Sequence, residues 1–280
     1  YHLAVTYQGD CLMATIEREA GRSVYYENYG SGSDAVILIH GWGMGLRAWD
    51  YTLQALLAAG HRVVALDHRG CGESDKDFQD MSINAIASDV VALVEQLGLS
   101  RVVLNGWSLG GAVAVEAASL LAQRCCGLVL TCAATPAYLQ KSDYPHGGTD
   151  DALAGTLAAM AADRVNFLAA LAQGVCAIEV SRQVQDWLWQ MFMRSSPLAA
   201  RTLAELGPLD QRDKLGAITA PVLSFVGAKD VVVDPAVCRS VADYNSAARI
   251  VEFEEAGHAP FIEEPERYNS EFVSFVNECL

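Results

Sequence analysis

Long apolar runs are missing from this sequence of 280 residues, and their absence excludes a membrane-spanning helix. Such a helix needs about 18 to 20 consecutive apolar residues, and no stretch of the chain approaches that length. The first ten residues, YHLAVTYQGD, also lack the basic start and apolar run of a signal peptide. We therefore expect a cytoplasmic protein with no membrane partner.

Positive charge is scarce as well. The chain has 19 lysines and arginines against 34 acidic residues, a net charge of −15, and no run of basic residues. A surface of this sign repels nucleic-acid backbones and anionic lipid headgroups. We expect no nucleic-acid partner, and we interpret the acidity as serving solubility. No feature of the sequence assigns an oligomeric state.

Cysteine pairs with the spacing of a metal or redox site are absent too. The chain has eight cysteines, and none forms a CxxC pair or joins a histidine at zinc-binding spacing. A chain of this length buries enough apolar surface to fold without disulfides, so we expect reduced and mostly buried cysteines. We expect no metal and no cofactor.

The sequence does contain strand-like segments at regular intervals. Two segments with alternating polarity flank a turn-like Glu19-Ala20-Gly21-Arg22 and predict a hairpin. Six continuous apolar runs follow, and such runs are typical of strands buried on both faces. In chain order the eight segments are Met13–Arg18, Ser23–Tyr29, Ala35–Ile39, Arg62–Leu66, Val102–Leu104, Leu128–Thr131, Val222–Val226 and Arg249–Phe253.

Helix-like stretches separate the apolar runs. They are Leu46–Ala59, Ile83–Leu97, Leu109–Gln123, Pro235–Tyr244 and Pro265–Val276. Alternation of strand and helix predicts an α/β fold in which helices cover both faces of a mostly parallel sheet, here of eight strands.

This alternation stops between about Thr135 and Asp213. The segment has no convincing strand, and residues 151–172 and 181–206 are helix-like. We therefore predict a helical cap at residues 135–213, inserted into a core made of residues 1–134 and 214–280.

A serine between glycines, in Gly106-Trp107-Ser108-Leu109-Gly110, is the first candidate for chemistry. An apolar strand leads into it and a helix-forming run leads out. So tight a turn strains the serine backbone and raises its side chain above the carboxyl edge of the sheet. Ser108 is therefore the predicted nucleophile, placed in a nucleophile elbow.

A serine hydroxyl needs a base, and the base needs an orienting carboxylate. His258 follows the last predicted strand and Asp230 follows the strand before it, so both lie at the same sheet edge as Ser108. Asp234 precedes a proline, which is typical of a helix cap. His40 is interpreted as structural. The predicted catalytic triad is Ser108, His258 and Asp230.

Backbone N–H groups must stabilise the negative charge that develops on the substrate oxygen. Leu109, directly after the nucleophile, supplies one group. The loop His40-Gly41-Trp42-Gly43 supplies the other, for which we choose Trp42. The indoles of Trp42 and Trp107 are also candidates for contact with the acyl group, and ordinary packing explains them equally well.

A second glycine-rich loop, Asp67-His68-Arg69-Gly70-Cys71-Gly72-Glu73-Ser74, follows another predicted strand. It contains an acid and a histidine, yet we interpret it as a structural turn held by local hydrogen bonds. His61 and His68 are interpreted as surface or turn residues.

Five motifs together resemble the α/β-hydrolase superfamily. They are HGWG (40–43), DHRGCGES (67–74), GWSLGG (106–111), GAKD (227–230) and GHAPF (257–261), in the family's order. HGWG, GWSLGG and HAPFI resemble the pimeloyl-ACP methyl ester esterase-like carboxylesterases most closely. The resemblance implies the α/β-hydrolase fold, and it gives the same triad and the same oxyanion-hole residues, Trp42 and Leu109.

The same resemblance introduces a carrier protein as a substrate, because basic lid residues hold the acidic carrier in that subfamily. The basic residues in the predicted cap include Lys141, Arg164, Arg182, Arg194 and Arg201. Many acids accompany them, and the whole chain is negative, so we expect a small-molecule ester rather than a carrier-bound one.

The sequence thus predicts a serine hydrolase that cleaves the carboxylic ester of a small hydrophobic substrate through an acyl-enzyme. C–C bond hydrolases and lactonases use the same triad and remain alternatives, as do perhydrolases of the haloperoxidase type and cofactor-free oxygenases. The predicted substrate contacts are Trp107, His146, Trp187 and Phe192, although the apolar cap residues fit a core of the cap itself equally well.

Overall fold

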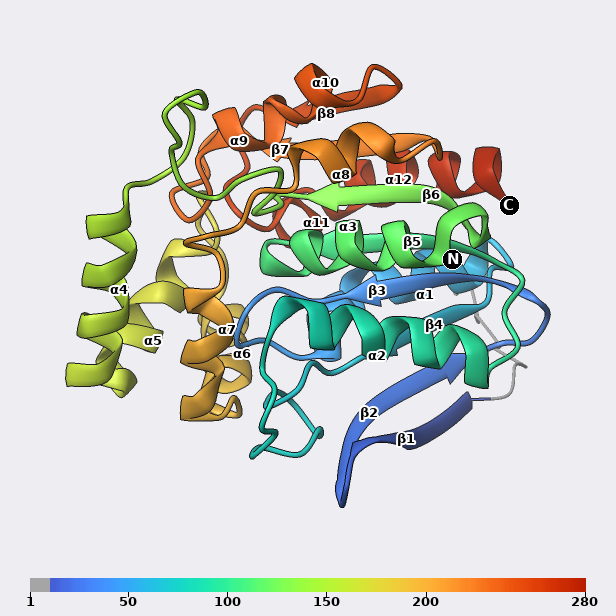
Figure 1. The fold of residues 1–280 in the computed structure, drawn as a ribbon, viewed down its shortest axis with the longest axis horizontal. Helices are drawn as coiled ribbons and strands as arrows, with labels where there is room; N and C mark the ends of the chain where they lie inside the picture. Colours follow the sequence, from blue (N-terminus) through green and yellow to red (C-terminus); the bar gives the residue numbers. More distant parts are fainter. Residues whose placement is uncertain (1–10) are drawn as a thin grey trace.

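A computed structural model describes residues 11–280, so the expectation drawn from the first ten residues lies outside the described part. The strands form one eight-stranded sheet of order β1-β2-β4-β3-β5-β6-β7-β8 (Figure 1). Their bounds are β1 Cys11–Glu19, β2 Arg22–Tyr29, β3 Asp34–Ile39, β4 Val63–Leu66, β5 Arg101–Trp107, β6 Cys125–Thr131, β7 Val222–Gly227 and β8 Ala248–Phe253. The pairs β1–β2 and β2–β4 are antiparallel and the others are parallel. The predicted fold class is confirmed.

The central strands are buried along nearly their whole length, as their continuous apolar runs predict. Strand β8 differs, because it lies at the sheet edge and is only partly buried. Strand β5 continues past the predicted Leu104 to Trp107. Its Asn105 is buried because the side-chain amide donates to Tyr268 Oη at 2.9 Å, which satisfies a polar group inside the core.

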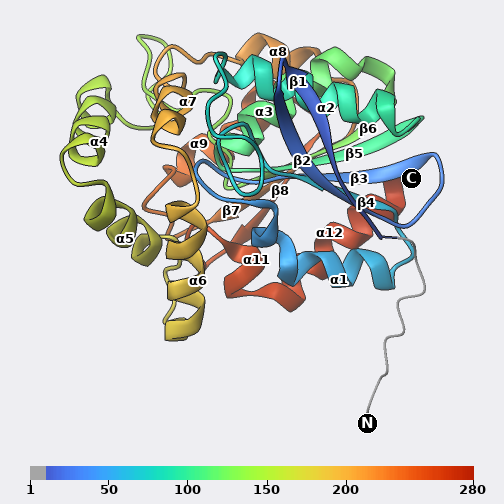
Figure 2. The ribbon, with the colours of Figure 1, turned by 90° about the horizontal axis from the view of Figure 1, so that it is seen from below.

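Helices cover both faces of the sheet (Figure 2). One face carries α2, α3 and α8, and the other carries α1, α11 and α12. Their bounds are α1 Asp50–Ala58, α2 Ile83–Gln96, α3 Leu109–Leu121, α8 Arg212–Ala217, α11 Pro260–Glu263 and α12 Pro265–Cys279. The helix expected over 235–244 is two short helices, α9 Pro235–Arg239 and α10 Val241–Tyr244. Asp234 caps α9 by accepting from Ala236 N, as its position before a proline predicts.

Residues 135–213, which we call the cap, lie beyond the carboxyl ends of the parallel strands (Figure 1). The cap contains α4 Asp150–Ala162, α5 Arg164–Gly174, α6 Arg182–Met193 and α7 Ala200–Ala204. The helix expected over 151–172 is two helices, since Asp163 breaks the first and caps the second by accepting from Asn166 N. The boundary predicted at 213/214 falls inside α8. The division into core and cap remains a prediction.

The two ends of the cap lie side by side. Thr135 Oγ1 donates to Gln211 Oε1 at 2.7 Å, and Gln211 N donates to Pro136 O at 2.8 Å. The chain therefore leaves the sheet after β6 and returns toward β7 through nearly the same place.

All eight cysteines are free thiols, and five of them are buried, in line with the expected use of cysteine. Within residues 11–280, no helix has both the length and the apolar character needed to cross a membrane.

Candidate active site

Ser108 occupies the sharp turn between β5 and α3. Its backbone angles are φ 58° and ψ −125°, a conformation that L-residues rarely adopt. The two flanking glycines are required by close backbone contacts. A Cβ atom at Gly106 would lie 2.2 Å from Gly110 O, and one at Gly110 would lie 2.4 Å from His40 O. The close packing of this turn therefore requires glycine at both positions, which explains the spacing of the G-x-S-x-G motif.

His258 and Asp230 form a buried pair at the same edge of the sheet. His258 Nδ1 lies 2.7 Å from Asp230 Oδ2. Because a carboxylate only accepts, Nδ1 carries the hydrogen and Nε2 is left as the basic nitrogen. Asp230 Oδ1 is held by the backbone N–H groups of Val232 and Val233, at 2.7 and 3.0 Å. These two hydrogen bonds fix the carboxylate that orients the imidazole.

Ser108 and His258 line one cavity of about 310 Å³ between the sheet edge and the cap. The predicted oxyanion-hole residues, Trp42 and Leu109, line it as well. Leu109 is the first residue of α3, where a backbone N–H has no acceptor within the helix. The cavity therefore brings together four of the five residues that the sequence singles out for acyl transfer, and the fifth, Asp230, lies behind it and bonds to His258.

The loop that carries Trp42 is supported from beneath by His40. The buried ring of His40 donates from Nδ1 to Gly41 O at 2.7 Å, and its Nε2 accepts from His68 N at 2.9 Å. The two imidazoles stack at 3.8 Å between centroids. Burial lowers the pKa of both histidines, so both stay neutral. The structural interpretation of His40 agrees with these contacts, whereas His68 is buried and not at the surface.

Two of the four predicted substrate contacts line the cavity and two do not. Trp107 and Phe192 are lining residues. The Trp107 indole also donates to His258 O at 2.8 Å, so it supports the loop that carries His258. His146 instead packs its ring against Tyr144, and Trp187 packs against Tyr51 of α1. Neither residue lines the cavity, because the ring of each packs against an aromatic side chain outside it.

Several lining residues escaped sequence reasoning. They are mostly apolar and come from the cap and from the loop after β7: Tyr138, Thr156, Phe167, Ala170, Leu171, Gly174, Val175, Leu203, Leu206, Val231, Val232 and Val233. The run Val231–Val233, directly after Asp230, was the one available signal, because three apolar residues in a loop at this edge need something to cover them.

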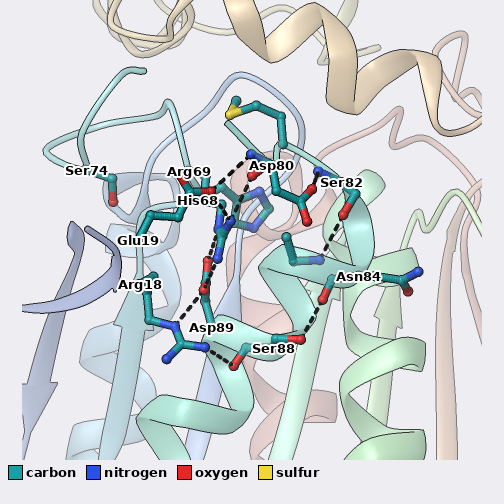
Figure 3. A network of polar contacts seen from close by, with 12 residues as sticks. Arg18, Glu19, His68, Arg69, Ser74, Asp80, Ser82, Asn84, Ser88 and Asp89 are labelled. Carbon is teal, nitrogen blue, oxygen red and sulfur yellow. Dashed lines mark hydrogen bonds and ion pairs between the residues drawn. The ribbon is translucent and has the colours of Figure 1, made fainter. Parts of the chain in front are cut away.

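The loop Asp67–Ser74 is a structural brace, as predicted. Asp67 accepts from Leu46 N and Glu73 N, each at 2.7 Å. Arg69 reaches Asp89 of α2 with two bonds of 2.7 and 2.8 Å, and Arg18 of β1 joins the same carboxylate (Figure 3). The network thus ties the loop to a strand and a helix, away from the cavity.

Among residues 11–280, one group of potential metal ligands consists of two predicted triad residues and a cysteine. Ligand atoms of Cys132, Asp230 and His258 lie within 4.8 Å of one another, and all three residues are buried. Burial and the nearby Asp230 carboxylate raise the pKa of the Cys132 thiol well above its ordinary value, so the thiol stays protonated. A protonated thiol is a poor ligand, and the imidazole Nδ1 is already bonded to Asp230. The prediction of no metal is therefore retained.

Comparison with known proteins places this geometry in a family. The model of the alpha/beta hydrolase fold matches residues 34–265. The pimeloyl-[acyl-carrier protein] methyl ester esterase of Aeromonas hydrophila is 33% identical over 263 residues, covering 91% of this chain and 99% of that protein. A non-heme chloroperoxidase of Streptomyces lividans is 29% identical, covering 94% of this chain and 99% of the relative. An esterase from Exiguobacterium antarcticum superposes with a TM-score of 0.89 at 30% identity, covering 95% of this chain and all of that one.

The matched region is well over half of the chain, and it includes Ser108, Asp230 and His258. The chain belongs to the α/β hydrolase family.

Proposed function

We propose that the chain is a carboxylesterase-type serine hydrolase with the triad Ser108, His258 and Asp230. The observation that carries the proposal is the convergence of a strained serine and an aspartate-bonded histidine on one cavity. The similarity to esterases at about 30% identity supports the same reaction class.

The reaction follows from the placement of these groups. His258 Nε2 takes the proton of Ser108 while the serine oxygen attacks the ester carbonyl. The N–H groups of Trp42 and Leu109 stabilise the oxyanion. His258 then returns the proton to the leaving alcohol, and Asp230 stabilises the imidazolium meanwhile. Water, activated by His258, attacks the acyl-enzyme and releases the acid.

The cavity favours an uncharged, apolar acyl group. None of its described lining residues is Asp, Glu, Lys or Arg, and most are aliphatic or aromatic. A charged acyl group would lose its hydration without gaining a partner there, which is strongly unfavourable. A volume of about 310 Å³ suits a small substrate.

A carrier-bound acyl chain is less well supported than a free ester. Arg164 donates to Ser195 O and Ser195 Oγ, and Arg194 pairs with Glu73 at the surface, so both already have partners within the chain. Lys141 donates to Gly207 O. Arg212 pairs with Asp143 and Asp210, so these four of the six basic cap residues already have partners within the protein, which leaves little free positive charge for an acidic carrier.

The direct test is Ser108→Ala, assayed on p-nitrophenyl esters of increasing acyl length. We expect a loss of roughly 10⁴-fold or more in kcat/KM. Ser119→Ala is the matched control, because Ser119 lies on α3, the helix that follows Ser108, and its hydroxyl donates to Val115 O. Ester turnover that survives in Ser108→Ala would exclude the triad.

Additional substrates separate most of the alternatives. Hydrolysis of an acyl-homoserine lactone, cleavage of a ring-cleavage dienone and perhydrolysis all need Ser108, so their rates relative to ester hydrolysis are compared in the unmodified protein. Cofactor-free oxygenation does not need the serine, so oxygen uptake in Ser108→Ala would favour that alternative.

A further inference from the structure

Glu263 is a buried carboxylate without a role in the mechanism above. It ends α11, five residues after His258, and its relative exposure is 7%. Four backbone N–H groups bind it: Gly257 N at 2.8 and 3.0 Å, Ala259 N at 3.2 Å, Ala177 N at 2.7 Å and Ile178 N at 3.2 Å. An ionised carboxylate accepts at both oxygens, which suits a site made only of donors.

Two of these N–H groups belong to the residues on either side of His258. Glu263 therefore fixes the Ala256–Gly257 peptide and the His258–Ala259 peptide, while the peptide between them is held by Val175 O. The backbone of His258 itself is held by Val175 O, which accepts from His258 N at 2.9 Å, and by the Trp107 indole. With its main chain fixed, the imidazole can keep both its bond to Asp230 and its place in the cavity that Ser108 also lines.

The other two N–H groups belong to the cap. Ala177 and Ile178 follow α5, whose last turn leads to Val175 in the cavity lining. The two segments touch closely, since a Cβ atom at Gly257 would lie 2.8 Å from Ala177 N. Glu263 thus joins the loop of the catalytic base to the part of the cap that forms the wall of the substrate cavity.

We propose that Glu263 is a positioning residue, which sets the orientation of His258 and holds the end of α5 against the same loop. The inference rests on the proposed function, because it assigns His258 as the base. Glutamate suits the site better than glutamine, because one end of an amide would direct its own N–H groups at backbone donors.

The test is Glu263→Gln, with Glu264→Gln as the matched control. Glu264 is the adjacent residue of the same loop, and its side chain is partly exposed and lies 3.6 Å from Arg267. Both variants remove one negative charge and keep the side-chain shape. We expect Glu263→Gln to lower kcat roughly 10- to 100-fold with a KM change of less than about 3-fold, because chemistry is impaired more than binding. Glu264→Gln should stay within about 2-fold in both constants.

Labelling of Ser108 by a fluorophosphonate provides the second readout. Its rate depends on the base and should fall in Glu263→Gln in parallel with kcat. Unchanged kcat and labelling would overturn the proposal, as would a loss no larger than the loss of folded protein measured by circular dichroism. If Glu263→Gln does not fold, Glu263→Asp decides: it keeps the charge but is one methylene too short, so full kcat in that variant would overturn the proposal.

The two proposals fail separately. Activity that survives in Ser108→Ala removes the proposed function whatever Glu263 does. An inactive Ser108→Ala beside a fully active Glu263→Gln removes only the role of Glu263.

Discussion

His258 and His40 are both buried histidines that follow a parallel strand of the same sheet, yet their surroundings differ. Both ring nitrogens of His40 are bonded within the core, to Gly41 O and to His68 N. His258 is bonded through Nδ1 to Asp230, and its ring borders the cavity. A histidine at this edge is suited to proton transfer only when one nitrogen is held and the other faces the substrate.

Replacing His258 should have the largest effect. We expect His258→Ala to lower kcat/KM on a short ester by roughly 10³- to 10⁵-fold, since both proton transfers lose their base. The melting temperature should change little by comparison. If His40→Asn instead produced the larger loss of turnover per folded molecule, the assigned roles of the two histidines would be reversed.

Substitutions in the network that braces the loop Asp67–Ser74 should lower stability and leave catalysis unchanged. The Asp89 side chain is 1% exposed and holds Arg69 and Arg18. Asp89→Asn should reduce the free energy of unfolding by about 3 kcal/mol, because the buried Arg69 guanidinium loses the Asp89 carboxylate and keeps only Glu19 as an acidic partner. Asp77→Asn is the control, because Asp77 is 67% exposed in its pair with Arg22 and should cost about 0 to 1 kcal/mol.

Urea denaturation measures both free energies. The esterase activity of folded Asp89→Asn should remain close to that of the unmodified protein. A large loss of kcat without a loss of stability would contradict the assignment of this network as a brace.

The comparison extends to the cap, where Phe192 lines the cavity and Trp187 does not. Phe192→Ala should raise KM for short esters by about tenfold, because substrate contact area is lost. The kcat/KM for esters with longer acyl chains should rise relative to that for short esters. Trp187→Ala should leave KM within about twofold. Equal effects of the two substitutions on KM would show that the substrate also reaches Trp187.

The smallest effect is a pH dependence of stability that comes from His40 and His68. Burial lowers the pKa of each in the folded protein, so the unfolded chain binds more protons once the pH falls below about 6.5. Their contribution is complete above that pH and decreases as the pH falls toward the folded-state pKa. The melting temperature should therefore decline between pH 7 and pH 5. This slope should be smaller in His68→Asn, which removes one of the two buried imidazoles.

The fold could be predicted from the sequence, and the candidate triad could be located in it, because both rest on local patterns. Buried strands appear as apolar runs, and the elbow at Ser108 needs glycines at fixed spacing. The length of strand β5 was underestimated because Asn105 is a polar residue, which a sequence pattern does not place inside a buried strand. Its side chain is buried with a hydrogen bond to Tyr268. His68 was misplaced for a similar reason, since its stacking on His40 depends on two segments that are distant in sequence.

The substrate cavity could be predicted only in part. Trp187 and Phe192 lie on the same helix, and only tertiary packing decides which of the two faces the cavity. The break at Asp163 also escaped prediction, because the surrounding alanines and leucines favour helix on both sides. The role of Glu263 depends on where Ala177 and Ile178 arrive in space, which no spacing reveals.

The adjacent ends of the cap have a consequence for engineering. Thr135 and Gln211 are one hydrogen bond apart, so the sheet needs only a short bridge between β6 and α8 at that point. A segment from another family member with equally close ends could be transplanted there while β6 and β7 keep their register. Such chimaeras should exchange acyl preference as a unit, provided that the incoming segment also supplies two N–H groups to Glu263.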